Sequence, residues 1–503
     1  MGTSIKKLKV ALPDLGISLF VALALFFASP GFDFWPLAVL AFAVLAYGFE
    51  RGKIKPWKLS FLTGFIYITL AMNWVTVPVT LFGGAPMAAG IVIVIFIGLL
   101  CALLFWLPMG WAWSKTNSFF LAALVLVALE LAKGRYFLGG VPWLNIAQTQ
   151  YNNTLALQLV SVLGEQGLSL ITVLLGFYLY KTLRTKDKYY ISVTLALLVI
   201  FLGYGALRLA THKLPAPTTT ARMLQTGIDQ KDKWDRNKAG ELLVSLTEGF
   251  KKAGEPGDYE LLILPETSFN YNPFTTPYIR QELDDISART AVLISADKRI
   301  PDGESYKLYN TLYLYKDGEI LEQYDKMRLA PFGEYFPFEK QLYPIRRFFF
   351  GDGPLFSPGQ RPIVMEYNEL KIAPFICYEG IFPELMAERV KLGANVFVIV
   401  SNDSWFGSSI GRNQNLAMNM IRAVEFDRYV LRTTQDGIST LVDPYGHKVV
   451  VFPEKSYYFS DVVFSVRETT TLFSTLNYTW YPFLLIGYAL YLVRKRCQKR
   501  LKG

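Results

Sequence analysis

The stretch APFICYEGIF (residues 373–382) joins an apolar run to a turn that holds a cysteine, an acid and a glycine. The run before Cys377 is typical of a buried strand, and Glu379 with Gly380 ends it. A free cysteine is most often a small buried hydrophobic side chain. At the junction of a strand and a turn it can also be a nucleophile, so this stretch alone leaves both interpretations open.

Further β-rich runs surround this stretch and alternate with helical ones. The strand-like runs begin at Ala221, Tyr259, Thr290, Leu308, Leu370, Asn395 and Ser439. Residues 236–252 and 415–429 have helical patterns. Strands interleaved with helices predict an α/β domain, or an α-β-β-α layered one, over residues 217–466.

Apolar runs fill the first 210 residues, and about 20 apolar residues are enough to cross a bilayer as a helix. They predict an α-helical polytopic membrane domain over residues 1–212 with about seven spans. An eighth span and a basic tail follow within residues 476–503. The expected spans are residues 15–28, 35–49, 59–75, 87–111, 119–132, 155–180, 189–209 and 480–493.

Charges in the connecting loops orient these spans. Lysines and arginines gather before the first span, at residues 51–58, at Lys115 and at residues 181–188, whereas the alternate loops hold almost none. The positive-inside rule then predicts cytoplasmic termini and an extracytoplasmic polar block. The first run also resembles a signal peptide, but an uncleaved span is favoured because further spans follow at once.

The composition supports a membrane protein and excludes several other classes. Of 503 residues, 52% are hydrophobic and 18% charged. The net charge of +10 comes from loops and the C-terminal tail, without a basic stripe, so no nucleic-acid partner is predicted. Three cysteines without a CxxC pattern and two histidines outside any motif argue against a disulfide framework, a Cys-His protease and a histidine metal site. No metal and no cofactor are expected.

Three segments of the polar block end a strand-like run with a chemically useful side chain. Glu266 follows LLILP, Lys326 lies in YDKMRLAPFGEYFPF, and Cys377 lies in the opening stretch. Each alone can be an ordinary turn or core residue. Together they suit catalysis, because a thiol with a pKa near 8.5 needs a base, and a carboxylate must serve where no histidine is at hand. A lysine ammonium can stabilise the thiolate and the oxyanion.

In this order the three segments resemble the Glu-Lys-Cys triad of the nitrilase (carbon-nitrogen hydrolase) superfamily, which implies an α-β-β-α sandwich. More narrowly, YDKMRLAPFGEYFPF, CYEGIFPEL and VSNDSWFG, with the flanking spans, are similar to the apolipoprotein N-acyltransferase family. The resemblance covers nearly the whole chain.

This resemblance implies that a phospholipid acyl chain passes to the cysteine as a thioester. It then passes to the α-amino group of the diacylglyceryl-modified N-terminal cysteine of a lipoprotein. Carried over, Cys377 is the nucleophile, Glu266 the general base and Lys326 the oxyanion stabiliser. The supporting positions are Trp234, Glu334, Tyr378 and Glu379. As alternatives, Glu334 merely orients Lys326, Tyr378 packs, and Trp234 touches lipid from a loop.

The implied location is the bacterial inner membrane, with the catalytic block on the periplasmic side. The implied partners are a phospholipid donor and an apolipoprotein acceptor, and nothing demands more than a monomer. A membrane-anchored amidase that hydrolyses small amides is the alternative within the superfamily. A transporter or lipid sensor with a degenerate enzyme domain is less consistent with the intact triad and with the lack of charge in most spans.

Overall fold

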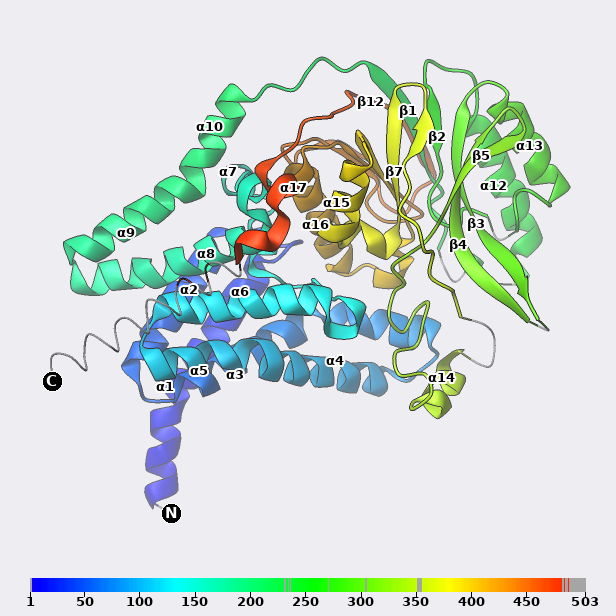
Figure 1. Cartoon of the computed structure of the whole chain (residues 1–503). Coiled ribbons are helices and arrows are strands. Elements are labelled where there is room, and N and C mark those ends of the chain that lie inside the picture. The colour runs from blue at the N-terminus through cyan, green and yellow to red at the C-terminus, as the bar shows by residue number, and fades with distance from the viewer. Residues whose placement is uncertain are drawn as a thin grey trace.

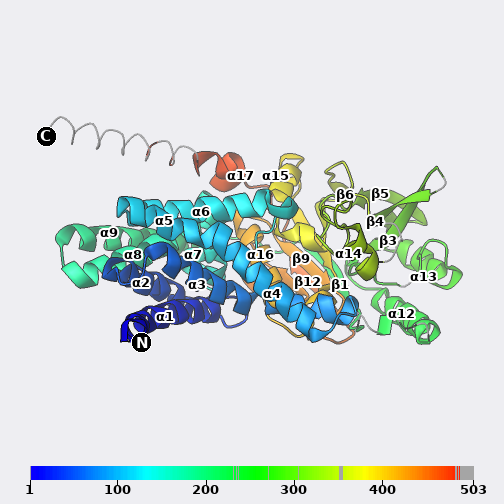
Figure 2. The same ribbon diagram turned by 90° about the horizontal axis from the view of Figure 1, so that it is seen from below.

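The computed structural model of the chain describes residues 2–229, 232–233, 235, 237–269, 271–303, 305–350, 355–481, 484 and 487. Helices fill the first 211 residues, and two β-sheets with their own helices follow (Figure 1). Two perpendicular views show the N-terminal helices on one side of the molecule and the sheets on the other (Figures 1 and 2).

Every apolar run predicted as a span up to residue 209 lies on helical segments. The main helices are α1 (Gly2–Ala28), α2 (Pro36–Arg51), α3 (Pro56–Ala71), α4 (Met87–Cys101), α5 (Leu107–Thr116), α6 (Phe119–Arg135), α7 (Thr154–Leu157), α8 (Val160–Thr185), α9 (Lys188–Leu198) and α10 (Tyr204–Thr211). Pro36 and Pro56 begin α2 and α3, at the position where a missing backbone N–H is harmless.

Fewer helices are suited to crossing a membrane than the eight expected. Among the described residues, three are long and apolar enough, namely Met87–Thr116, Val160–Thr185 and Lys188–Thr211. A fourth is counted if Pro56–Ala71 and Asn73–Phe82, bent by 48°, form one broken span. Helices α2 and α6 have 16 and 17 residues, short of the roughly 20 that a bilayer needs. The expected span at 480–493 falls mostly outside the described residues.

The block after α10 contains two six-stranded sheets. Their orders are β12-β1-β2-β3-β4-β5 and β11-β10-β9-β8-β7-β6. The strands of the first sheet are β1 (Thr219–Gln225), β2 (Leu261–Ile263), β3 (Ala291–Asp302), β4 (Ser305–Lys316), β5 (Glu319–Asp325) and β12 (Tyr458–Phe464). Those of the second are β6 (Met365–Tyr367), β7 (Leu370–Ile376), β8 (Val396–Ser401), β9 (Val430–Thr434), β10 (Thr440–Val442) and β11 (Lys448–Val451).

Alternating side chains place the sheets between two helical layers. In β2, Leu261 and Ile263 face a core shared by both sheets, whereas Leu262 faces α12 (Ala239–Ala253) and α13 (Pro277–Ser287). The second sheet packs its outer side chains against α15 (Pro383–Lys391) and α16 (Gly411–Phe426). The predicted α-β-β-α layering is therefore confirmed.

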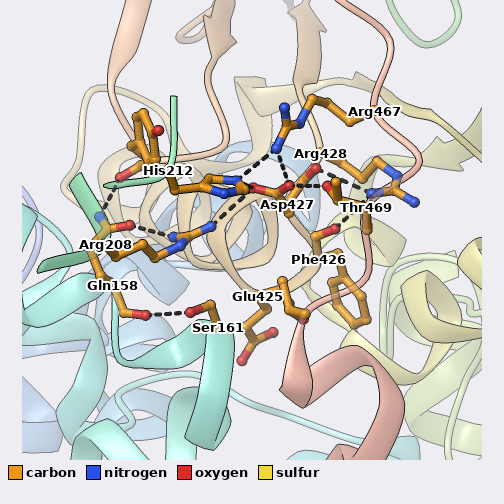
Figure 3. Close-up of polar contacts among 12 residues, drawn as sticks. Gln158, Ser161, Arg208, His212, Glu425, Phe426, Asp427, Arg428, Arg467 and Thr469 are labelled. Carbon is orange, nitrogen blue, oxygen red and sulfur yellow. Dashed lines mark hydrogen bonds and ion pairs between the residues drawn. The ribbon is translucent and has the colours of Figure 1, made fainter. Parts of the chain in front are cut away.

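Helix α16 also joins the sheets to the membrane helices. Buried Arg422 of α16 pairs with Glu165 of α8 at 2.7 Å. At the end of α16, Asp427 accepts hydrogen bonds from Arg208 of α10, at 3.0 Å, and from Arg467 (Figure 3). These buried ion pairs fix one helical layer of the α/β block on the N-terminal helices.

Candidate active site

Three strand ends bring the predicted triad together. Glu266 follows β2, Lys326 directly follows β5, and Cys377 directly follows β7. Lys326 Nζ lies 3.7 Å from Glu266 Oε1, and both side chains are almost completely buried. The Glu266 carboxylate and the Lys326 ammonium are both near enough to the Cys377 thiol to change its pKa, in opposite directions. A base, a cation and a thiol therefore share one buried site.

Cys377 lies on a strained elbow between β7 and the short helix Cys377–Ile381. Its φ of +52° falls in the left-handed region that few residues other than glycine adopt. Such a conformation costs about 1–3 kcal/mol and persists where the surrounding structure enforces it. The junction of strand and turn that the sequence predicts at Cys377 is therefore present.

Burial and the charge of Glu266 together raise the pKa of the Cys377 thiol to about 12, although Lys326 opposes them. The thiol is therefore neutral at pH 7. Because only the thiolate is a strong nucleophile, a base must remove the proton as the sulfur attacks.

Two amide groups hold the carboxylate of Glu266 in place. Its Oε1 accepts a hydrogen bond from Asn310 Nδ2 at 2.8 Å, and its Oε2 accepts one from the Asn402 amide at 2.9 Å. Burial raises the pKa of Glu266, although Lys326 lowers it. A carboxylate with a raised pKa takes a proton more readily.

Lys326 remains an ammonium ion at this site. Burial alone would lower its pKa, but the carboxylates of Glu334 and Glu266 outweigh burial and hold that pKa above its ordinary value. Glu334 Oε1 accepts from Lys326 Nζ at 2.7 Å, and its Oε2 accepts from the Ala330 amide at 2.8 Å. Glu334 therefore orients the lysine and the loop that carries it.

Glu379 lies beneath the elbow and is completely buried. Its Oε1 accepts from the Tyr324 hydroxyl at 2.7 Å and from the Met327 amide at 2.7 Å, and its Oε2 accepts from the Ile376 amide at 2.9 Å. These bonds tie the Lys326 loop to the end of β7. Glu379 therefore holds the Lys326 loop against the end of β7, as a supporting position would.

Tyr378 points from the elbow towards the N-terminal helices. Its hydroxyl donates to the Gly140 carbonyl at 2.6 Å, and its ring stacks on Trp143 with centroids 5.7 Å apart. Arg328 donates to the Gly139 carbonyl from the loop that follows Lys326. The segment after α6 thus contacts both the elbow and the Lys326 loop.

Not every relevant residue was found from the sequence. Asn310 and the contact made by the Asn402 amide were missed; Asn402 lies in the quoted VSNDSWFG stretch, whereas Asn310 lies within β4 and carries no local signal. The predicted Trp234 lies outside the described residues. No group of three or more metal-ligating side chains occurs in the part of the chain that the structure describes.

Comparisons with known proteins agree with this arrangement. Residues 21–178 match the family described as apolipoprotein N-acyltransferase N-terminal domain, and residues 220–457 match the carbon-nitrogen hydrolase family. The apolipoprotein N-acyltransferase of Pseudomonas aeruginosa is 32% identical over 84% of this chain and 84% of its own. That of Geobacter metallireducens is 31% identical over 85% of this chain and 84% of its own.

Solved structures also include similar proteins. An amidase of the nitrilase superfamily from Nesterenkonia is 20% identical, covers 50% of this chain and 92% of its own, and has a TM-score of 0.37. Both families match this one chain, the first over its helices and the second over its sheets. The two curated relatives match it across both parts, over 84–85% of its length. The chain belongs to the apolipoprotein N-acyltransferase family.

Proposed function

We propose that this enzyme moves an acyl chain from a phospholipid to the α-amino group of the N-terminal diacylglyceryl-cysteine of lipoproteins, through a thioester on Cys377. The observation that carries the proposal is the shared site of Cys377, Glu266 and Lys326, which the segment after α6 contacts. A thiol site that lies against the segment between α6 and α7 of the apolar N-terminal part suits lipid substrates.

In the first half-reaction, Glu266 takes the thiol proton while the Cys377 sulfur attacks the ester carbonyl of the phospholipid. Lys326 stabilises the oxyanion of the tetrahedral intermediate. The intermediate collapses to the thioester, and Glu266 returns the proton to the departing alkoxide. A lysophospholipid is released.

In the second half-reaction, the lipoprotein amine attacks the thioester carbonyl. Glu266 accepts a proton from the amine, and Lys326 again stabilises the oxyanion. Collapse forms the amide and expels the Cys377 sulfur, which regains its proton. Glu334 holds Lys326 through both steps, and Glu379 and Tyr378 hold the elbow.

We further propose that residues 1–212 and 476–503 form the membrane domain, with cytoplasmic termini, and that residues 217–466 lie on the periplasmic side of the bacterial inner membrane. The end of α8 and the end of α2 support this orientation, because Lys181 and Arg184 of α8 pair with Glu50 of α2 at 2.7 and 2.5 Å. Basic residues thus gather where α2 and α8 end, which the positive-inside rule assigns to the cytoplasmic side.

The test is a transfer assay with the purified protein, a phospholipid labelled in its acyl chains and a diacylglyceryl-cysteine peptide. We expect the label in amide linkage on the peptide amine. A peptide already acetylated at that amine is the matched acceptor control and should gain no label. Release of the label only as free fatty acid, with the free-amine peptide present, would favour a hydrolase and contradict the proposal.

A further inference from the structure

The nucleophile and the general base of the proposed reaction lie on different sheets. Cys377 follows β7 of the second sheet, whereas Glu266 follows β2 of the first. Hydrogen bonds between the strands of one sheet therefore do not set the distance between the thiol and the carboxylate. This distance depends on contacts that cross from one sheet to the other.

Gln435 makes such a crossing contact. It directly follows β9 of the second sheet, and its backbone amide donates to the Ser401 carbonyl at 3.2 Å. Its side-chain Nε2 donates to the Glu266 carbonyl at 2.5 Å and to the Thr267 carbonyl at 2.9 Å. Gln435 is 1% exposed. A buried amide from the second sheet thus holds the backbone of the base on the first.

Thr267, which Gln435 holds, has a strained backbone. Its φ is +47°, and a β-branched residue in this left-handed region is an outlier. Two further side chains hold Thr267: Ser295 Oγ accepts from its amide at 2.5 Å, and Lys233 Nζ donates to its Oγ1 at 3.0 Å. Strain of this kind persists only where the surrounding structure enforces it, and it is typical of functional sites.

We infer that Gln435 is a positioning residue for the general base, because its amide holds the strained Glu266–Thr267 backbone that directs the Glu266 carboxylate to the Cys377 thiol. The inference rests on the proposed function. A base must lie within hydrogen-bond reach of the proton that it removes, so a small displacement of this backbone slows the reaction. The Asn402 amide, which also comes from the second sheet, donates to the carboxylate itself at 2.9 Å. The sheet that carries the thiol therefore fixes both the backbone and the carboxylate of the base.

The test is the acylation of Cys377 by p-nitrophenyl palmitate, an ester without a lipid headgroup. The burst of p-nitrophenolate counts the competent sites, so the rate is measured per site. Gln435→Met keeps the length of the side chain and removes its N–H donors. It should lower the rate per site by about tenfold or more at an unchanged KM, because a displaced base weakens only the transition state.

Thr267→Gly separates this role from a merely structural one. Glycine adopts a positive φ without a steric penalty, so the backbone at position 267 then needs less support. If Gln435 acts through the strained backbone, the loss caused by Gln435→Met should shrink to about threefold or less in the Thr267→Gly protein. Gln435→Asn, which keeps the amide but is one carbon shorter, is the second variant and should behave in the same way.

Gln158→Met is the matched control. Gln158 is also completely buried, and its Nε2 also donates to two backbone carbonyls, those of Thr154 at 2.9 Å and Tyr445 at 3.0 Å. It lies at the junction with α10 rather than at the triad (Figure 3). Its substitution should leave the rate per site within about twofold of the unaltered protein, whichever residue is at position 267.

An unchanged rate per site in Gln435→Met overturns the inference while the proposed function stands. An equal loss with threonine and with glycine at position 267 shows that Gln435 does not act through the strained backbone, and this also overturns it. If Gln435→Met forms no competent sites, Gln435→Asn decides by the same comparison. If the unaltered protein acylates Cys377 neither from this ester nor from a phospholipid, the proposed function itself fails.

Discussion

At the scale of single residues, the chemistry depends on a thiol that its surroundings keep protonated. Glu266 is one cause, because its negative charge raises the pKa of Cys377. The same carboxylate is the proposed base. Replacing Glu266 should therefore lower the pKa of the thiol and, at the same time, remove the base. A cysteine that is already a thiolate at neutral pH would not show this pair of effects.

Glu266→Gln should slow acyl transfer by about 10²–10⁴-fold, the usual contribution of a general base. It should also move the pH midpoint of Cys377 alkylation by iodoacetamide to lower pH, because a raising charge is gone and the thiolate is the reactive form. Timed alkylation across a pH series, followed by mass spectrometry, measures the midpoint. Glu339→Gln, at an exposed position beyond the Lys326 loop, is the control. A midpoint that stays or rises in Glu266→Gln would contradict the account.

The pH dependence of acylation should report Glu266. Only its carboxylate form accepts a proton, so the rate should rise with pH through a midpoint above the ordinary value of 4.5. Glu334 raises the pKa of Glu266 by repulsion, so removing that charge in Glu334→Gln lowers the pKa and moves the rising limb to lower pH. Single-turnover acylation rates across pH test this, and a limb displaced to higher pH would refute the assigned coupling.

At the scale of elements, the segment between α6 and α7 supports the site. Leu138, Gly139 and Gly140 accept hydrogen bonds through their carbonyls from Tyr335, Arg328 and Tyr378, respectively. Gly140 has φ +113°, and a Cβ there would come within 2.5 Å of the Gly134 carbonyl and 2.8 Å of a Phe382 ring carbon. Position 140 therefore needs glycine both for its backbone conformation and because no space is left for a Cβ atom.

Gly140→Ala should displace this segment from the elbow and lower kcat by about tenfold or more, since small misplacements of reacting groups are costly. Gly84→Ala is the matched control: Gly84 also has a positive φ, +65°, but no atom lies within 4 Å of its added Cβ. Acyl-enzyme formation with p-nitrophenyl palmitate measures the effect without a lipid headgroup. Equal activity in the two variants would show that the segment does not position the elbow.

Much of the element-scale account could be predicted from the sequence. Glu266, Lys326 and Cys377 each end a strand-like run, which is a local pattern. Asn310 lies inside β4, and the pairing of β4 with β5 places it beside Lys326, whose amide donates to the Asn310 carbonyl at 2.9 Å. Its side chain reaches Glu266, which follows β2, so this contact depends on strands that are distant in sequence. The burial of Glu379 likewise depends on donors about 50 residues away in sequence, so no local pattern reveals it.

The number of spans was less predictable for a related reason. Apolar composition identifies helices, but burial against protein and exposure to lipid require the same residue types. Almost all of α8 is buried inside the structure, where it packs against α2, α6 and α16. Its apolar residues therefore serve protein packing as much as membrane insertion.

At the scale of the whole molecule, buried ion pairs join the two parts of the chain. Asp427 is 1% exposed and accepts from Arg208, Arg467 and Thr469, and His212 Nε2 lies 3.3 Å from its Oδ1 (Figure 3). Removing a buried charge leaves its partners unpaired, so Asp427→Asn should lower the free energy of unfolding by about 3–5 kcal/mol. Thermal unfolding followed by tryptophan fluorescence in detergent provides the measurement.

Asp302→Asn provides the comparison for Asp427, because Asp302 pairs with Lys307 at the surface, where both side chains are more than half exposed. Loss of such a pair should change stability by less than about 1 kcal/mol. If the two variants unfold at the same temperature, Asp427 does not stabilise the junction between the membrane helices and the catalytic block.

The most direct test of the central claim is mass spectrometry of the Cys377 peptide after the purified protein meets phospholipid without an acceptor. The account predicts one acyl chain in hydroxylamine-sensitive thioester linkage on Cys377, which disappears when a diacylglyceryl-cysteine peptide is added. Cys377→Ala should carry no such adduct. An acyl chain on another residue, or a thioester-linked adduct that persists in Cys377→Ala, would contradict the account.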